Sequence, residues 1–218
     1  MELKDVNIYR ITHIENIPHI LEHGITHCQS ESRNGRYVNI GDVSLIDNRR
    51  TKTVVVDNGD LEFESSKTIV LGEYTPFYFG IRMPMLYVIQ NGGNFVMKAT
   101  RPDDIIYIVC SMKRVLSKNL EFYFTDGHAT DMYTTFYEKS CINQLVAVVN
   151  WEAVRSHYWG GFENLDIKRM KQAEFLISGD VTPDTIFGFG CYSEKSKSVL
   201  LSYGIEAGMI KVIPKAYY

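Results

Sequence analysis

Gln172 and Glu174 are the residues whose types and spacing best suit chemistry. They stand near the start of an apolar segment, residues 171–177, which predicts a buried strand. Side chains two apart on a strand share a face, so we expect Gln172 and Glu174 to face one cleft while Ala173 and Phe175 face the core. A carboxylate in such a cleft can accept hydrogen bonds from hydroxyl groups and stabilise positive charge that develops on a substrate. A solvated strand start is the alternative, and the pair alone does not exclude it.

The rest of the chain supplies the elements that must position this pair. Aromatic and β-branched segments predict strands at residues 8–13, 53–56, 74–80, 105–110, 122–129, 185–191 and 210–213. Helical periods and capping residues predict helices at residues 17–24, 42–50, 84–89, 151–156 and 193–203. Residues 157–170 carry a glycine pair and several charges and predict an exposed loop. Strands without regularly intervening helices indicate an α+β fold with a mixed or split sheet. No G-x-G-x-x-G motif follows a strand, which argues against a Rossmann site.

The composition is that of one soluble domain without a strongly basic surface. The chain has 218 residues, of which 45% are hydrophobic and 22% charged, and a net charge of −3. This charge argues against a nucleic-acid partner unless a local patch supplies the cations. Arg33, Arg36, Arg49, Arg50 and Lys52 lie close together in the sequence and could form such a patch or a solvated loop.

No metal site, disulfide or membrane segment is predicted. The four cysteines are widely spaced without a C-x-x-C pair, and Cys110 and Cys191 lie in apolar strands as expected core thiols. His19, His23 and His27 recur every four residues, but no acids follow that spacing, so we expect exposed helix-face histidines rather than ligands. Neither a leader nor an apolar run of the ~20 residues that span a bilayer is present. We therefore expect a cytoplasmic protein with reduced thiols.

The order of the short polar and aromatic blocks resembles the DarT family of DNA ADP-ribosyltransferase toxins. The matching blocks are residues 9–13, 39–41, 49, 74–79, 84–86, 125–129, 172–174 and 191–193. The resemblance implies an ADP-ribosyltransferase-like α+β fold in which split antiparallel sheets hold NAD in a cleft between them. It also implies a single domain over residues 1–218, in which roughly residues 26–71 form a flexible insert that covers NAD.

The resemblance implies roles for particular side chains. Glu174 would hold the ribose of NAD and stabilise an oxocarbenium-like transition state, and Arg49 would meet the diphosphate and approach the catalytic centre. The residues expected to contact NAD are Thr12, His13, Asn16, Asn39, Arg49, Tyr74, Tyr78 and Met85. The residues expected to contact DNA are Arg50, Arg82, His128 and Gln172.

Several of these assignments have structural alternatives. His13 could instead cap the helix that follows it. Arg50 is adjacent to Arg49, so the alignment could slip by one residue. Tyr74 and Tyr78 could be core residues rather than nicotinamide contacts.

The resemblance also implies the substrates and the partner. NAD would be a substrate, and the acceptor would be a base in single-stranded DNA, because a ring nitrogen inside a duplex is paired and unreachable. The blocks are nearer the thymidine-modifying type than the guanosine-modifying type. A macrodomain antitoxin would remove the mark. The alternatives are a transferase acting on protein or RNA, a silent NAD-binding module, and an NAD glycohydrolase in which water intercepts the cation.

Overall fold

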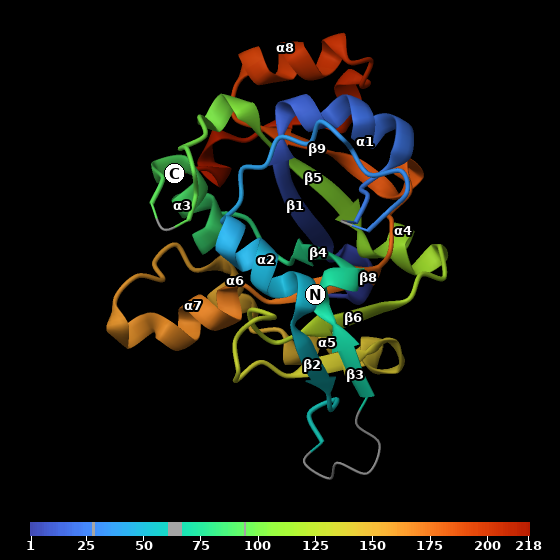
Figure 1. Ribbon diagram of the computed structural model, residues 1–218, viewed down its shortest axis with the longest axis vertical. Helices are drawn as coiled ribbons and strands as arrows, with labels where there is room; N and C mark the ends of the chain where they lie inside the picture. Colours follow the sequence, from blue (N-terminus) through green and yellow to red (C-terminus); the bar gives the residue numbers. More distant parts are fainter. Residues whose placement is uncertain (28, 61–66, 94) are drawn as a thin grey trace.

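The computed structural model describes residues 1–27, 29–60, 67–93 and 95–218. Eight strands form one sheet in the order β10-β9-β5-β1-β4-β8-β6-β7, and β2 and β3 form a separate two-stranded sheet (Figure 1). The strands are β1 Asn7–His13, β2 Thr53–Val56, β3 Lys67–Val70, β4 Tyr74–Tyr78, β5 Ile105–Ser111, β6 Phe122–Thr125, β7 Phe136–Glu138, β8 Glu174–Ser178, β9 Ile186–Cys191 and β10 Ile210–Val212. Neighbouring strands are antiparallel except for the parallel pair of β9 and β10.

The large sheet is split where β1 meets β4. Among the described residues, these two strands are paired only at Tyr9 and Tyr78. By contrast, β1 pairs with β5 along its whole length, and β4 pairs with β8 from Tyr74 to Tyr78. The large antiparallel sheet and the small second sheet confirm the predicted fold class, and the junction of β1 and β4 divides the large sheet into two halves.

Eight α-helices surround the sheet in the described residues. They are α1 Ile17–His23, α2 Val43–Thr51, α3 Pro84–Asn91, α4 Met112–Ser117, α5 Leu145–Val148, α6 Trp151–Arg155, α7 Leu165–Lys171 and α8 Glu194–Ser202. Side chains cap two of these helices: the Asp42 carboxylate accepts from the Leu45 N–H, and the Ser193 hydroxyl accepts from the Ser196 N–H. In Figure 1, α1 and α8 lie near β9, β5 and β1, while the β2–β3 hairpin projects from the opposite end of the molecule.

Short 3-10 turns complete the connections. They are η1 Leu3–Asp5, η2 Ile14–Asn16, η3 Leu71–Glu73, η4 Pro102–Asp104, η5 Lys139–Gln144, η6 Phe162–Asn164, η7 Pro183–Thr185, η8 Ala207–Met209 and η9 Pro214–Ala216. No helix among the described residues is long and apolar enough to cross a membrane.

The structure corrects the sequence interpretation around Gln172. Residues 157–170 are not an uninterrupted loop, because they contain η6 and most of α7. Gln172 is the C-cap of α7 with φ −97° and ψ 21°, so it does not lie on a strand. Its backbone N–H donates to the Arg169 carbonyl, and strand pairing begins only at Glu174. Good helix formers in 165–171 extend the helix to the edge of the sheet, so the expectation that Gln172 and Glu174 share a strand face was wrong.

The hydrophobic core around β8 contains the residues that were predicted to face inward. Ala173 and Phe175 are fully buried, as predicted. The Phe175 ring packs against Phe122 at 4.6 Å and edge-on against Phe79 at 6.3 Å between centroids. This packing locks β8 in register and thereby fixes the position of Glu174 at its first residue.

The two strand cysteines are core thiols, as predicted. Cys110 and Cys191 are both fully buried. Burial raises the pKa of the Cys110 thiol to about 12, so little reactive thiolate forms there at neutral pH. Cys28 lies outside the described residues, and Cys141 is half-buried.

Candidate active site

Glu174 is a fully buried carboxylate held by the backbone of a neighbouring turn. Its Oε1 accepts a hydrogen bond from the Ala129 N–H at 2.9 Å. Its own N–H donates to the Thr125 hydroxyl at 2.8 Å, and that hydroxyl donates in turn to the Gly127 carbonyl at 2.6 Å. The turn after β6 therefore orients a carboxylate that has no access to bulk water, where its charge acts most strongly on nearby groups.

Arg49, from the last turn of α2, neutralises this carboxylate. Its Nη1 donates to Glu174 Oε1 at 3.1 Å. Its Nη2 lies 2.9 Å from Oε2, which is a close charge contact outside hydrogen-bond direction. Arg50 points away: its side chain is 60% exposed and lies 3.9 Å from Asp47. Of the two adjacent arginines, Arg49 is thus the one beside Glu174.

A glycine allows α2 to come this close to the sheet. A Cβ on Gly72, in η3, would lie 2.4 Å from the Arg50 carbonyl oxygen. Just before it, the Leu71 N–H donates to the Lys52 carbonyl at 2.9 Å. The end of α2 is therefore docked on the residues that lead into β4, beside β8, and the Arg49 side chain reaches Glu174 from this helix.

His128 is the third polar side chain at this centre. Its Nε2 lies 3.9 Å from Glu174 Oε1, and its Nδ1 is 2.7 Å from the Thr130 hydroxyl. Burial lowers the pKa of His128, and nearby Arg49 and Lys52 act in the same direction, against the opposing effect of Glu174. The imidazole is accordingly neutral at pH 7.

The lowered pKa of His128 predicts a loss of stability in mild acid. The unfolded chain binds a proton at His128 near pH 6.5 while the folded protein resists it, so the free energy of unfolding falls as the pH drops below 6.5. The stability that comes from keeping His128 neutral in the folded protein is fully present above that pH. We expect His128→Gln to reduce the loss, measured by urea unfolding between about pH 7.5 and 5.5. His23→Gln, at a half-exposed position, is the control, and equal pH slopes for His128→Gln and wild type would contradict the prediction.

A cavity of about 160 Å³ opens beside this centre. Its lining includes five residues predicted from the sequence, namely Asn39, Arg49, Tyr78, Met85 and His128. Tyr78 is the cross-strand partner of Glu174, and burial together with the Glu174 charge raises the pKa of its hydroxyl. The phenol therefore stays protonated and can donate a hydrogen bond to a ligand.

A larger cavity of about 540 Å³ shares the segment 39–41 with the first. Its lining includes His13, Asn39, Lys98 and Arg101. The His13 Nδ1 accepts from the Glu15 N–H at 3.2 Å, so the capping role that was the structural alternative is present. With Nδ1 as acceptor, the neutral ring carries its proton on Nε2, which remains a donor. The two cavities adjoin at segment 39–41, and the lining of each includes cations.

Thr12 and Asn16 support segment 39–41, which lines both cavities. Asn16 is fully buried, and its amide donates to the Thr12 hydroxyl at 3.0 Å and to the Val38 carbonyl at 2.9 Å. Its amide oxygen accepts from the Val38 N–H at 2.8 Å. These bonds hold the chain that leads into segment 39–41, while contacts of Thr12 and Asn16 with NAD stay predictions.

Tyr74 and Arg82 do not line the cavity beside Arg49 and His128. Tyr74 lies at the far end of β4 and packs edge-on against Tyr123 at 5.4 Å, where burial raises the pKa of its hydroxyl to about 12. Arg82 lies past the other end of β4, with its guanidinium 4.4 Å from the Tyr218 ring centroid. Their roles in NAD and DNA binding stay predictions.

A third hollow, of about 450 Å³, reaches His128 from the other side. Its lining is His128, Asp131, Tyr133, Leu165, Asp166, Lys168, Arg169 and Gln172. Tyr133 is 77% exposed and presents its ring to solvent. His128 thus lines both the cavity beside Arg49 and a hollow with an exposed aromatic ring, the kind of group on which a base can stack. The cation Arg169 of this hollow is paired with Asp126 and Asp166.

Sequence reasoning missed three residues of the site. Arg10 lines the cavity beside Arg49 and donates to the Pro76 carbonyl at 2.9 Å, while Thr125 and Ala129 hydrogen-bond to Glu174. All three fall inside blocks that carried the family resemblance. The alternation of β1 places Arg10 on the same face as Thr12, which is the signal that could have identified it. Among the described residues, no group of three or more metal-binding side chains is found.

Comparison with known proteins assigns this chain to a family. Residues 9–218 match the family described as "ssDNA thymidine ADP-ribosyltransferase, DarT". The chain belongs to the DarT family. A DNA ADP-ribosyl transferase of Thermus sp. (strain 2.9) is 33% identical over 174 residues, which are 78% of this chain and 73% of that protein. Another, from Escherichia coli O127:H6, is 31% identical over 191 residues, covering 86% of this chain and 81% of its own.

Solved DarT structures share the whole fold. The complex of Thermus sp. 2.9 DarT with ADP-ribosylated ssDNA matches with a TM-score of 0.81 and 26% identity, covering 98% of this chain and 97% of that one. The complex of the same protein with NAD+ matches with a TM-score of 0.74 and 25% identity, covering 99% and 98%. The family resemblance and the ADP-ribosyltransferase fold are therefore confirmed.

Proposed function

We propose that this DarT family member transfers ADP-ribose from NAD to a base of single-stranded DNA, with thymidine as the preferred acceptor. The observation that carries the proposal is the cluster of Glu174, Arg49 and His128, in which His128 lines both the cavity beside Arg49 and the hollow that contains Tyr133. Relatives described as DNA ADP-ribosyl transferases, and a relative with this fold in complex with ADP-ribosylated ssDNA, support it.

In this proposal Glu174 acts on the ribose of NAD. The bond between nicotinamide and the ribose breaks, and nicotinamide leaves with the electron pair. The carboxylate, buried and oriented by Ala129, accepts a hydrogen bond from a ribose hydroxyl and stabilises the cation that forms. The ring nitrogen of the base then bonds to the ribose carbon and loses its proton, for which Glu174 or the neutral His128 is the nearby base.

NAD must change the pairing of Arg49. Glu174 and Arg49 face each other in the structure, and Arg49 also lines the cavity. The diphosphate of NAD is a bidentate acceptor that can take over the guanidinium. We infer that this exchange frees the carboxylate for the ribose, so that Glu174 becomes available to the substrate only when NAD is bound.

The decisive experiment is mass spectrometry of mixed-sequence single-stranded oligonucleotides after incubation with NAD. An ADP-ribose adduct confined to thymidine supports the proposal, and an adduct on guanosine alone would overturn the base preference. Nicotinamide release that DNA does not change, without any adduct, would favour a glycohydrolase. Labelling of protein or RNA instead of DNA would favour the other transferases, and intact NAD would favour a silent binding module.

Tyr133→Ala is expected to weaken single-stranded DNA binding by about 1–3 kcal/mol, the usual contribution of one stacked base. The reason is that its exposed ring is the aromatic face of the hollow beside His128. Fluorescence anisotropy of a labelled oligonucleotide measures the affinity. Tyr203→Ala, at a half-buried tyrosine next to α8, is the control, and an equal loss in both variants would argue against stacking at Tyr133.

We further propose a toxin role with a macrodomain antitoxin as partner. A relative from Thermosipho africanus is described as a fusion of a DNA ADP-ribosyl transferase with a DNA ADP-ribosyl glycohydrolase, which joins the two opposing activities in one chain. Action on DNA, with NAD as substrate, favours the cytoplasm as its site. Growth arrest on expression, relieved by co-expression of a macrodomain glycohydrolase, is the expected result.

A further inference from the structure

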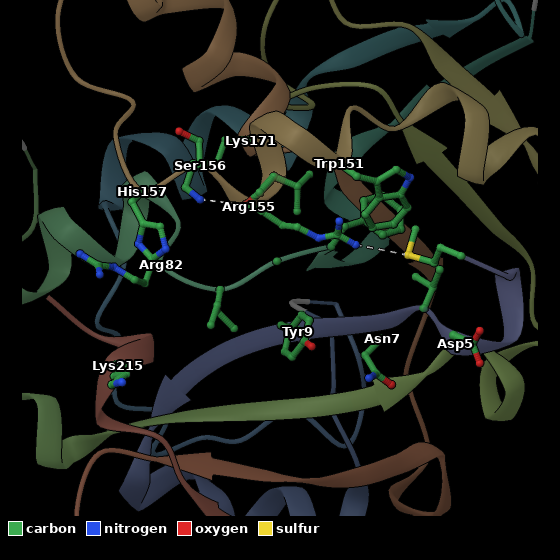
Figure 2. A pocket seen from close by; sticks show the side chains of 16 residues that line it. Asp5, Asn7, Tyr9, Arg82, Trp151, Arg155, Ser156, His157, Lys171 and Lys215 are labelled. Carbon is green, nitrogen blue, oxygen red and sulfur yellow. Dashed lines mark hydrogen bonds between the residues drawn. The ribbon is translucent and has the colours of Figure 1, made fainter.

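A separate cavity of about 380 Å³ occupies the other side of the sheet split. Asn7 and Tyr9 of β1 line it, as do residues 79–82 that follow β4. Since β1 and β4 are paired at Tyr9 and Tyr78, the chains diverge beyond this pair and leave room between them. Figure 2 shows side chains from α6, the end of α7 and the C-terminal segment completing the wall.

Positive charge dominates this cavity. Its lining includes Arg82, Arg155, Lys171 and Lys215, together with His157, against the single acid Asp5 (Figure 2). None of these four cations forms an ion pair within the described part of the chain. Cations gathered without ion-pair partners repel one another, so an anion in their midst would be bound favourably.

Two of these cations have buried N–H groups that donate no hydrogen bond within the described part of the protein. Lys171 is only 1% exposed, and its Nζ donates to the Val154 carbonyl at 2.9 Å. An ammonium has three N–H groups, so this contact leaves two. The Nε of Arg82 is buried and has no hydrogen-bond partner. Burial, followed by the charge of Arg82, lowers the pKa of Lys171 to about 8. Buried donors without acceptors are costly in a protein, and a ligand that accepts from them removes this cost.

The walls of the cavity also suit a ligand that has an apolar or aromatic part in addition to an anionic group. The rings of Tyr9, Phe79 and Trp151 face it beside the cations. Its volume falls within the range of small-molecule sites, in which apolar walls hold the body of a ligand and a few polar groups orient it. Guanidinium and ammonium groups together are the usual partners of phosphate oxygens.

We propose that this cavity binds a phosphate group carried by a nucleotide. Two sources supply that chemistry: a backbone phosphate of the DNA strand whose base reaches Glu174, or the phosphate of a free nucleotide. The first source rests on the proposed function. It is compatible with the fold because Lys171 ends α7 three residues before Glu174, while Lys168, Arg169 and Gln172 of the same segment line the hollow beside His128.

The test uses the exposed cations at the rim, which can be changed without disturbing the core. The variant is Arg155→Gln/Lys215→Gln, and the control is Lys113→Gln/Lys211→Gln, which removes two exposed lysines from outside the cavity lining. Inorganic pyrophosphate is titrated first, followed through tryptophan fluorescence, since Trp151 lines the cavity. We expect saturable binding that weakens by roughly tenfold for each cation lost, the effect of one charge-assisted hydrogen bond.

A labelled single-stranded oligonucleotide distinguishes the sources. If the ligand is the DNA backbone, the salt dependence of its binding should fall by about 0.7 in log–log slope for each lost contact. An unchanged slope with weakened pyrophosphate binding would identify a free phosphorylated ligand. Unchanged pyrophosphate binding and unchanged slope would overturn the proposal. The pyrophosphate titration needs neither NAD nor DNA, so it can succeed even where no ADP-ribose adduct forms.

Discussion

Replacement of Glu174 by glutamine is expected to lower the rate of ADP-ribose transfer by about 10²–10⁴-fold. The amide keeps the shape of the side chain, and its oxygen can still accept from the Ala129 N–H, so the position in β8 is retained. What is lost is the negative charge that stabilises the oxocarbenium-like transition state, in a site that excludes water. Adduct formation on a single-stranded oligonucleotide, measured in single turnover with saturating NAD, reports the chemical step.

Glu152→Gln is the matched control, because it makes the same change at an exposed position of α6. Its transfer rate should equal that of the wild type. NAD binding by Glu174→Gln is measured in parallel, so that a loss of rate is separated from a loss of substrate. A Glu174→Gln rate within threefold of the wild type would show that Glu174 does not act in the chemical step. A threefold ratio corresponds to about 0.7 kcal/mol of activation free energy.

Arg49→Met is expected to destabilise the folded protein by about 3–5 kcal/mol, the usual cost of removing one partner from a buried ion pair. Glu174 is fully buried and Arg49 is only 15% exposed, so the substitution leaves a carboxylate in the interior without its counter-charge. Adding Glu174→Gln should restore most of the lost stability, because the uncompensated charge is then absent. Chemical denaturation of the wild type, both single variants and the double variant gives the coupling energy directly.

Arg50→Met provides the control for this cycle. Its side chain is largely exposed, and its contact with Asp47 is a surface pair, so the free energy of unfolding should change by less than about 0.5 kcal/mol. If Arg49→Met and Arg50→Met had the same small effect, the ion pair with Glu174 would not be formed in solution. If the double variant were as unstable as Arg49→Met alone, the cost would come from lost packing instead of the buried charge.

Local sequence signals predicted most helices and strands. The apolar residues of β5 and β9, the Asp42 and Ser193 caps and the glycine after α1 act through neighbours a few residues away, and these elements were confirmed. The segment before Glu174 was wrongly predicted to be a loop, because its polar composition concealed the run of helix-forming residues that makes up α7. The chain changes from helix to strand at Glu174, where pairing of β8 with β4 begins.

The sequence by itself determined the family, the α+β class and the carboxylate around which the site is built. All three follow from residue types in a fixed order along the chain, which can be recognised without knowing the tertiary contacts. Only the tertiary structure decided that Arg49 rather than Arg50 meets Glu174, across 125 positions of chain. It also decided that β1 and β4 are joined at Tyr9 and Tyr78, which opens a cavity on each side of that pair. Such pairings depend on the packing of distant segments, whose geometry no local period encodes.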